Sequence, residues 1–194
     1  MNYYIFQQIN GWAGHSKLLD NIMITLSDSL PYIAVAIILY LWFIANKQQG
    51  IEKRYTTIYA VFSSAIALVV NAIIHLLYYH ARPFVTHHVQ QLVPHTVDSS
   101  FVSDHAVLVF AIAWIFIMRN ERFKYPILIW AIVVGLSRIY VGVHYPLDVI
   151  GSALISCATS GIVLYFSAKL EPLVQLLFRL YNQLIKLKLL LPKH

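Results

Sequence analysis

Long runs of apolar residues restrict what this sequence can fold into. A helix that crosses a bilayer needs roughly 20 mostly apolar residues, with a range of about 17–25. Five stretches approach or reach that length, at residues 22–46, 56–79, 101–118, 125–141 and 147–168. Inside lipid every backbone polar group must be hydrogen-bonded within its own segment, so these stretches are predicted to be helices. We expect a kink at Pro31 in the first of them.

The composition indicates the same class of protein. Hydrophobic residues make up 59% of the 194 residues and charged residues only 11%, whereas an average soluble domain has roughly 25% charged residues. These values exclude a soluble globular domain, a disordered chain and a nucleic-acid-binding protein. We therefore predict an all-α, polytopic membrane helix bundle with about five to six transmembrane helices. The length predicts a single domain, residues 1–194, with a core at about residues 20–168.

Both ends of the chain are predicted to be amphipathic helices at the membrane interface. Ile5, Phe6, Ile9 and Trp12 recur at helical spacing, in a stretch without the features of a signal peptide; a frayed polar terminus is the alternative. Residues 169–194 form a cationic tail with a leucine every three or four positions. We expect this tail to lie on membrane lipids at the cytoplasmic surface, where anionic headgroups attract Lys and Arg; a homodimer contact is the alternative.

The basic residues are distributed unevenly between the two sides of the predicted bundle. The side with most of them carries Lys47, Lys53, Arg54, Arg119, Arg122, Lys124, Lys169, Arg179, Lys186, Lys188 and Lys193. The other side carries Lys17, Arg82 and Arg138. Cytoplasmic loops collect Lys and Arg, so the first side is predicted to be cytoplasmic. The chain is thus expected to be a multi-pass cell-membrane protein with a cytoplasmic C-terminus, and with the N-terminus, the 80–100 loop and the 142–146 turn facing outward.

Most histidines nevertheless map to the outward side, together with two arginines and several carboxylates. The group comprises His80, His87, His88, His95, His105, His144, Arg82, Arg138, Asp98, Asp104 and Asp148. Ionisable groups near membrane spans are costly and indicate a functional site. Arginine binds phosphate oxygens through two parallel hydrogen bonds, so two converging arginines beside histidines predict a phosphate site.

The strongest local pattern is Ser137-Arg138-x5-His144-x3-Asp148. Asp148 follows His144 by four positions and falls in the first turn of the next helix. Its carboxylate is therefore expected to reach a ring nitrogen of His144, fix the tautomer and raise the basicity of the other nitrogen. The alternative is that Asp148 only caps the helix and His144 is an interfacial histidine.

Two further clusters lie at outer helix ends. In Ser103-Asp104-His105, the Ser103 hydroxyl and the free N–H groups of the helix start could cradle an anion, with His105 placed to protonate a leaving oxygen; a simple N-cap is the alternative. In His75-x6-Arg82-Pro83, the first two residues share a helix face two turns apart if the helix continues. Asn71, one turn further in, is expected to be buried and hydrogen-bonded without touching a ligand.

These three clusters, in this order, resemble the type-2 phosphatidic acid phosphatase superfamily. The family pattern reads K-x6-R-P, then P-S-G-H, then S-R-x5-H-x3-D, and the third motif is matched at every fixed position. Within the superfamily the chain is similar to the small bacterial undecaprenyl-diphosphatases associated with bacitracin resistance. Its compact size, the Ser-Asp-His variant of the second motif, the Arg-Pro-Phe-Val run at 82–85 and the His-Tyr-Pro turn carry this likeness.

The resemblance implies phosphoryl transfer without a metal or other cofactor. His144 would be the nucleophile that forms a phosphohistidine, Asp148 would orient and activate it, and His105 would be the general acid. The groups implied to bind the phosphoryl oxygens are Arg82, Arg138, Ser103 and the backbone N–H of Asp104, with His75 standing where the family has Lys. The implied substrate is a polyprenyl diphosphate, undecaprenyl diphosphate, whose cleavage on the outer face recycles the cell-wall lipid carrier and gives bacitracin tolerance.

Two departures from the family pattern leave alternatives open. His75 replaces Lys and carries charge only when protonated, and Val102 replaces Pro and adds an N–H that must find a partner. We expect restoration of Pro at position 102 to raise turnover.

The alternative functions are a phosphatase for phosphatidylglycerophosphate or phosphatidate, a catalytically silent lipid-binding protein, and a metal-binding or transport protein. The last would use His80, His87, His88 and His95, whose spacing matches no standard metal site.

Overall fold

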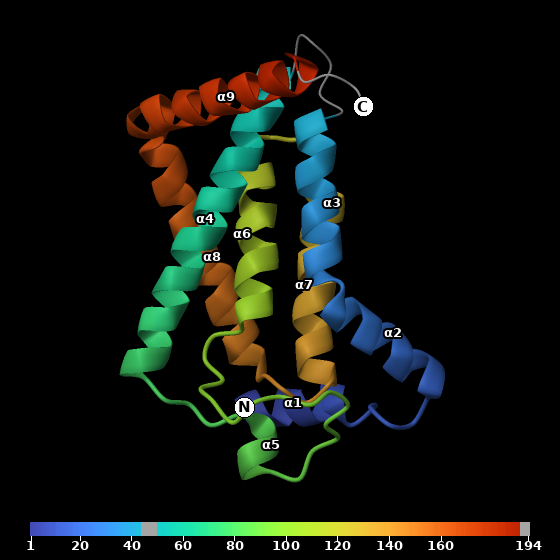
Figure 1. Cartoon of the computed structure of the whole chain (residues 1–194). Coiled ribbons are helices and arrows are strands. Elements are labelled where there is room, and N and C mark those ends of the chain that lie inside the picture. The colour runs from blue at the N-terminus through green and yellow to red at the C-terminus, as the bar shows by residue number, and fades with distance from the viewer. Residues whose placement is uncertain (44–49, 191–194) are drawn as a thin grey trace.

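The computed structural model describes residues 1–43 and 50–190, and every regular element in these ranges is a helix. The elements are α1 (Asn2–Asn10), α2 (Lys17–Asp28), α3 (Leu30–Phe43), α4 (Gly50–Leu77), α5 (Pro83–Thr86), α6 (Asp104–Met118), α7 (Lys124–Tyr140), α8 (Pro146–Tyr165) and α9 (Ser167–Leu190). Helices α3, α4, α6, α7 and α8 run side by side, with α9 across one end and α1 and α5 at the other (Figure 1). The predicted all-α bundle is confirmed.

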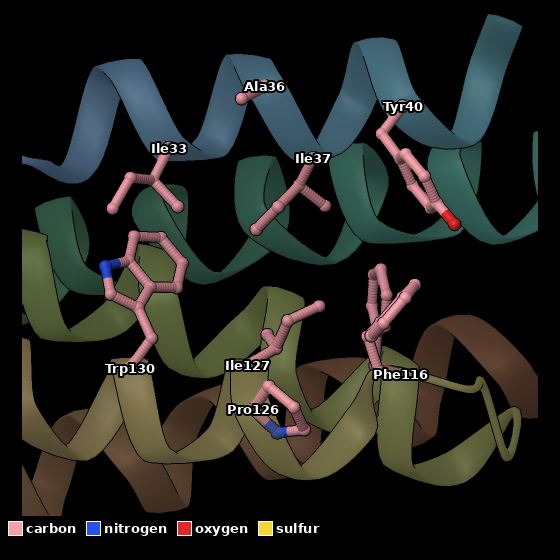
Figure 2. Close-up of a pocket in the computed structure, with 9 residues that line it drawn as sticks. Ile33, Ala36, Ile37, Tyr40, Phe116, Pro126, Ile127 and Trp130 are labelled. Atoms are coloured by element: carbon pink, nitrogen blue, oxygen red, sulfur yellow. The ribbon is translucent and has the colours of Figure 1, made fainter. Parts of the chain in front are cut away.

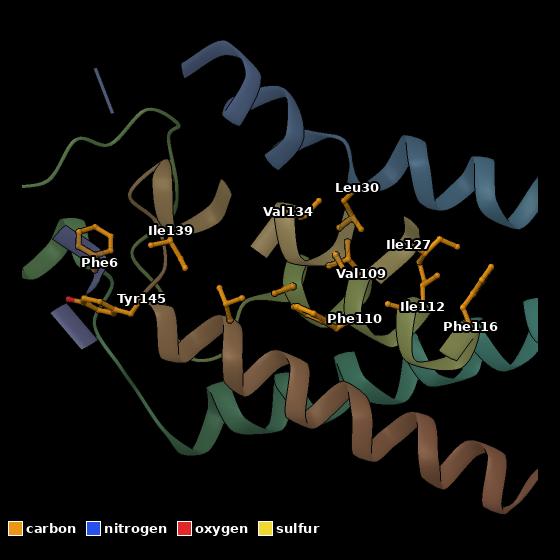
Figure 3. Close-up of a cluster of buried hydrophobic side chains, with 14 of the residues drawn as sticks. Phe6, Leu30, Val109, Phe110, Ile112, Phe116, Ile127, Val134, Ile139 and Tyr145 are labelled. Atoms are coloured by element: carbon orange, nitrogen blue, oxygen red, sulfur yellow. The ribbon is translucent and has the colours of Figure 1, made fainter. Parts of the chain in front are cut away.

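Helix α6 forms the centre of the bundle and packs against α4, α7 and α8. It is apolar on all sides, as expected for a helix that is buried all round. Its buried residues are Ala106, Val107, Val109, Phe110, Ala111, Ile112, Ala113, Ile115 and Phe116. Figure 3 shows this core continuing through Ile127 and Val134 of α7 to Phe6 and Tyr145 at the α1 end. The core therefore extends up to the end of the bundle where the polar clusters lie.

The outer faces of the long helices carry large exposed apolar side chains. They include Val35, Leu39, Val61, Val69, Ile73, Ile129, Ile132, Ile150, Leu154 and Ile162. Such a surface suits hydrocarbon and would drive aggregation in water. The segments Ile51–Leu77 (27 residues) and Pro146–Tyr165 (20 residues) are long and apolar enough to cross a membrane, and α2 and α3 pass the same test as a bent pair. The membrane character is thus supported, while the count of five to six spans stays a prediction.

The first predicted segment bends next to Pro31, as expected, and the bend divides it into two helices, α2 and α3. The direction changes by 51° between α2 and α3, and Pro31 lies in the first turn of α3, next to the bend. Ser29 stands at the break, where its hydroxyl donates to the Leu26 carbonyl over 2.6 Å. Helix α2 consequently leaves the bundle axis and slants toward the α1 end (Figure 1).

The N-terminal stretch forms a helix rather than a frayed end. Phe6 is 1% exposed and Asn10 is 4% exposed. The Asn10 amide donates to the carbonyl oxygens of Gln90 and Tyr140, both over 2.8 Å. Helix α1 therefore ties the 80–100 loop to the end of α7, and these parts share one end of the bundle, as predicted.

The opposite end carries α9, which covers most of the predicted cationic tail (Figure 1). Lys47 and Lys193 lie outside the described residues, and so do the side chains of residues 184–190. The structure thus separates the two ends as the charge pattern predicts, while the assignment of one end to the cytoplasm stays a prediction.

An apolar groove lies between α3 and α7, and Phe116 of α6 forms part of its lining (Figure 2). Its volume is about 500 Å³, and its lining is almost wholly apolar. It extends from Ile33 and Trp130 toward Tyr40 and Phe116 (Figure 2).

Candidate active site

The turn between α7 and α8 places His144 at the α1 end of the bundle. Gly142 has φ +87°, and a Cβ at that position would lie 2.6 Å from the Gln90 carbonyl oxygen. Pro146 then starts α8, where its missing N–H costs nothing. The Gly and the Pro together hold His144 and Tyr145 between two helix ends.

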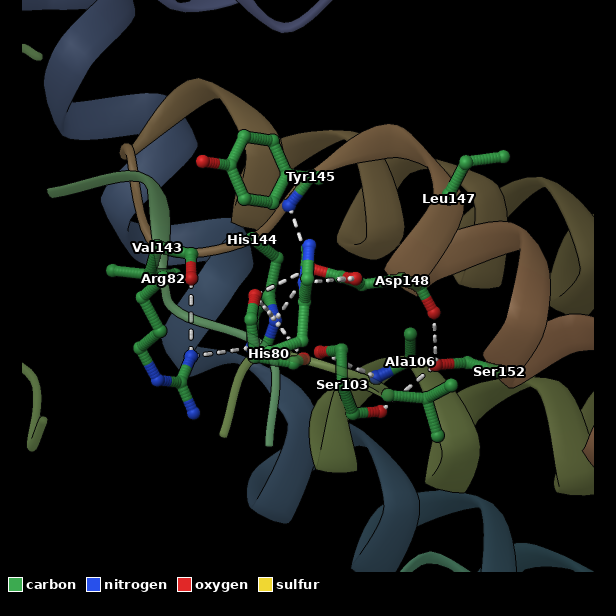
Figure 4. Close-up of polar contacts among 12 residues, drawn as sticks. His80, Arg82, Ser103, Ala106, Val143, His144, Tyr145, Leu147, Asp148 and Ser152 are labelled. Carbon is green, nitrogen blue, oxygen red and sulfur yellow. Dashed lines mark hydrogen bonds and ion pairs between the residues drawn. The ribbon is translucent and has the colours of Figure 1, made fainter. Parts of the chain in front are cut away.

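His144 is 2% exposed, and both of its ring nitrogens have partners (Figure 4). Nδ1 lies 2.9 Å from the Ser100 carbonyl oxygen, and Nε2 lies 3.0 Å from Nη1 of Arg82. A carbonyl only accepts and a guanidinium only donates. Nδ1 must therefore carry the proton, and Nε2 presents a lone pair. This is the tautomer that a nucleophilic Nε2 requires.

Asp148 lies behind His144, as the four-residue spacing predicts. Its Oδ2 is 3.5 Å from Nδ1, within ion-pair range, while the Ser100 carbonyl is the closer partner of that nitrogen. Oδ2 also accepts hydrogen bonds from the Tyr145 backbone N–H over 2.8 Å and from the Ser100 hydroxyl over 2.5 Å. Asp148 therefore both caps α8 and faces His144, so the two alternatives for this residue are not exclusive.

Ser100 connects His144 and Asp148, and it was not among the predicted site residues. Its hydroxyl serves Asp148 and its carbonyl serves His144. The only sequence signal was the polar run at 98–100 directly before an apolar segment. Ser100 is fully buried, so its polar groups are committed to these contacts.

Arg82 is 2% exposed and points into the same site. Its Nη1 also donates to the Val143 carbonyl over 3.0 Å, and its Nε donates to Oδ1 of Asp98 over 2.6 Å. Partial burial raises the pKa of Asp98, but the hydrogen bond and charge of Arg82 outweigh it and hold this pKa below its usual value. The Asp98 carboxylate is therefore ionised and restrains the Arg82 guanidinium.

Arg138, at the end of α7, is 3% exposed. Its Nη1 donates to the Ser27 hydroxyl of α2 over 2.5 Å, while its Nε has no hydrogen-bond partner among the described residues. Ser27 was not predicted as a site residue. The slanted α2 brings it there, which makes this helix part of the site.

The second cluster lies at the start of α6, as predicted. Ser103 is the N-cap, and its hydroxyl accepts from the Ala106 N–H over 3.4 Å. Asp104 and the half-buried His105 occupy the first turn, and His105 lies within electrostatic range of Arg138 and Arg82. The structure therefore brings His105 and both arginines into one site.

His75 and Arg82 do not share a helix face, because α4 ends at Leu77 and Arg82 lies beyond it, before α5. Arg82 reaches the site, whereas His75 and Asn71 contact the loop backbone at Val102. His75 Nε2 lies 3.1 Å from the Val102 carbonyl oxygen. Asn71 is fully buried; its amide donates to the same carbonyl over 3.2 Å and to Asp104 over 2.5 Å, and its oxygen accepts the Val102 N–H over 3.3 Å. The predicted buried, hydrogen-bonded state of Asn71 is confirmed. In the structure the Nε2 of His75 contacts the backbone of this loop. A contact between His75 and phosphate stays a prediction.

The electrostatics of the site favour the neutral form of His144 and His95. Burial lowers the pKa of His144 against the opposing effect of Asp148, and the charges of Arg82 and Arg138 lower it further. Burial and the charge of Arg82 also lower the pKa of His95. The His95 ring stands edge-on to the His144 ring, with centroids 6.1 Å apart.

The other histidines of the outward side do not gather around a common point. His87 stacks on Tyr3 with centroids 3.8 Å apart, and His88 is exposed. Within residues 1–43 and 50–190, no group of three or more His, Cys, Asp or Glu side chains is arranged to hold a metal ion. This arrangement gives no support to a metal-transport function.

Comparison with known proteins places the chain among membrane phosphatases. The sequence profile described as the PAP2 superfamily matches residues 56–172. The Bacillus subtilis protein named undecaprenyl-diphosphatase BcrC is 37% identical over 185 residues, covering 95% of this chain and 94% of that protein. The Bacillus licheniformis protein named bacitracin transport permease protein BcrC is 31% identical, covering 91% of this chain and 86% of that protein.

Solved structures share the architecture. Aquifex aeolicus LpxE superposes with a TM-score of 0.71 at 26% identity, covering 84% of this chain and 94% of that one. A PAP2-type phosphatidylglycerolphosphate phosphatase from Bacillus subtilis superposes with a TM-score of 0.62, covering 86% of each chain. The second match has 19% identity and shows the shared fold alone.

Proposed function

Because the chain belongs to the PAP2 superfamily of phosphatases, we propose that it hydrolyses undecaprenyl diphosphate to undecaprenyl phosphate through a phosphohistidine on His144. The similarity to undecaprenyl-diphosphatase BcrC over nearly the whole chain supports this substrate. The observation that carries the mechanism is the pairing of His144, with Nδ1 on the Ser100 carbonyl and Nε2 on Arg82. It presents the nucleophilic lone pair beside a phosphate-binding group.

In the first step, Nε2 of His144 attacks the terminal phosphorus. A nitrogen–phosphorus bond forms, and the bond from that phosphorus to the bridging oxygen breaks. The electron pair leaves with undecaprenyl phosphate, which takes a proton from His105. Arg82 moves its hydrogen bond from Nε2 to a phosphoryl oxygen as the substrate enters. Phosphoryl transfer depends mainly on such positioning and on stabilising the charge of the equatorial oxygens.

The remaining phosphoryl oxygens are assigned to Arg138, the Ser103 hydroxyl and the Asp104 backbone N–H. Two fixed guanidinium groups supply the positive charge that stabilises the transition state, so we propose a reaction that needs no metal cofactor. In the second step, water attacks the phosphohistidine, His105 accepts its proton, and inorganic phosphate leaves. Asp148 balances the positive charge on the imidazole ring throughout.

We place the site at the outer face of the cell membrane. The support is the charge distribution, since most Lys and Arg belong to the end that carries α9. Hydrolysis there returns the lipid carrier as its monophosphate and removes the diphosphate that bacitracin binds.

Sidedness is tested by cysteine labelling in intact cells, with Cys157→Ala as the background. A membrane-impermeant maleimide is expected to label His88→Cys at the site end and to spare Arg122→Cys at the α9 end; both positions are exposed. The reverse labelling pattern would place the site in the cytoplasm.

The activity is tested by phosphate release from undecaprenyl diphosphate with detergent-purified protein in EDTA, beside His144→Ala. We expect release that survives EDTA, is lost in His144→Ala and leaves a phosphoenzyme in a rapid acid quench of wild type. Cleavage of phosphatidylglycerophosphate or phosphatidate instead would keep the site and replace the substrate. Absence of cleavage of every lipid phosphate would favour a catalytically silent lipid-binding protein.

A further inference from the structure

Two buried polar atoms face each other on the side of Asp148 away from its hydrogen bonds. Oδ1 of Asp148 and Nδ1 of His80 each lack a hydrogen-bond partner among the described residues, and they lie 3.8 Å apart. The Asp148 side chain is 1% exposed and the His80 side chain 35% exposed. A buried carboxylate oxygen without a donor is unfavourable. His80 is the donor that the structure places next to it (Figure 4).

The backbone around His80 is tied to the segment that carries Ser100. The His80 N–H donates to the Ser99 hydroxyl over 3.2 Å, and the His80 carbonyl accepts from the Ser100 N–H over 2.7 Å. The His80 ring lies parallel to that of Tyr78, with centroids 6.2 Å apart, and tilted against Tyr145 at 5.3 Å. These contacts hold the ring beside Asp148, with its Nδ1 within ion-pair range of Oδ1.

We propose that His80 is a positioning residue that acts on His144 through Asp148. Its Nδ1–H donates to Oδ1 and fixes the rotation of the carboxylate, so that Oδ2 stays toward Nδ1 of His144. The backbone N–H of Tyr145 and the hydroxyl of Ser100 hold Oδ2 from the other side. His80 thus completes the donors around Asp148, in the way that outer hydrogen bonds orient a catalytic carboxylate.

A cavity beside the pair supports this assignment. Its volume is about 280 Å³, and its lining comprises Asn2, Tyr78, His80, Phe101, Leu147 and Asp148. The titratable groups that face His80 are Asp148, Tyr78 and Tyr145. No lysine or arginine is among these lining residues, so no basic side chain of the cavity competes with His80 for the free oxygen.

The proposal is tested with a pair of variants, and its activity readout rests on the proposed phosphatase function. His80→Phe keeps an aromatic ring against Tyr78 and removes the donor, whereas His80→Asn puts an amide N–H near the position of Nδ1. We expect kcat to fall about tenfold in His80→Phe with KM nearly unchanged, and to stay within about threefold of wild type in His80→Asn. His88→Asn, an exposed histidine of the same loop, is the matched control and should match wild type.

Wild-type kcat in His80→Phe would overturn the proposal, and so would an equal loss in both variants, which indicates packing alone. A second measurement does not depend on catalysis. In protein labelled with ¹⁵N-histidine, Asp148→Asn should move the Nδ1 resonance of His80 and leave that of His88 in place. An unmoved His80 resonance would refute the pairing even if the wild-type protein cleaved no lipid phosphate, whereas absent cleavage alone would refute only the proposed function.

Discussion

Ser100→Ala tests whether the link between His144 and Asp148 supports catalysis. The substitution removes the hydroxyl that donates to Oδ2 of Asp148 over 2.5 Å and keeps the backbone carbonyl that holds Nδ1 of His144. The substitution therefore removes one hydrogen bond to the Asp148 carboxylate and leaves the tautomer of His144 unchanged. Because the Ser100 side chain is fully buried, water does not replace the lost hydrogen bond.

The expected size of the effect follows from the charge on the acceptor. A hydrogen bond to a charged group contributes about 1.5–3 kcal/mol. Oδ2 would then keep the Tyr145 N–H as its one remaining hydrogen-bond donor among the described residues, so the carboxylate is held less firmly toward His144. If the hydrogen bond makes its full contribution only in the transition state, where the imidazole becomes cationic, kcat falls about 10- to 160-fold. KM should change little, because Ser100 is not assigned to the substrate.

The assay is steady-state phosphate release in detergent, with Ser156→Ala as the matched control. Ser156 is also a fully buried serine, and its hydroxyl donates to the Val107 carbonyl over 2.8 Å, away from Asp148. Both variants should lose comparable thermal stability, and only Ser100→Ala should lose turnover. Equal kcat values in the two variants would refute the reasoning.

Three further predictions concern other residues of the candidate active site. Val102→Pro should lower turnover severalfold and not raise it, because proline removes the N–H that the Asn71 oxygen accepts; an increase in kcat would contradict this. Ser27→Ala should raise KM for lipid phosphates about three- to tenfold, because Arg138 loses its partner on α2; unchanged KM in the same titration would exclude that role. Burial holds the pKa of His144 below its ordinary value, so its contribution to stability is complete above about pH 6.5 and is lost as the pH falls. At pH 5 this loss is about 2 kcal/mol, and thermal unfolding of His144→Gln should show a smaller acid-induced drop in Tm than wild type, whereas equal drops would show that His144 is not buried neutral.

The parts of this architecture that were predictable depend on local pattern. Apolar runs indicate helices, and the four-residue spacing of His144 and Asp148 fixes their relation within a single turn. The charge asymmetry correctly groups α1, the 80–100 loop and the 142–146 turn at one end. Each of these inferences uses residues close in sequence or a property summed over many residues.

The contacts that the sequence could not predict join residues far apart. Ser100 is 44 positions from His144, and Ser27 is 111 positions from Arg138. Each partner is a single serine without periodicity, and its role depends on how the helices pack. The size of the bend between α2 and α3, 51°, also depends on how the helices pack. This bend determines whether Ser27 reaches the site.

The two residues that depart from the family pattern, His75 and Val102, contact each other in the structure. Val102 has an N–H where the family has proline, and that N–H is accepted by Asn71. The carbonyl of the same residue lies 3.1 Å from the ring of His75, which stands where the family has lysine. A lysine would supply a permanent charge for phosphate, whereas this histidine and Asn71 together hold the backbone next to the Ser103 cap. The chain thus fixes the entrance to its phosphate-binding helix with hydrogen bonds where the family pattern uses the rigid ring of proline.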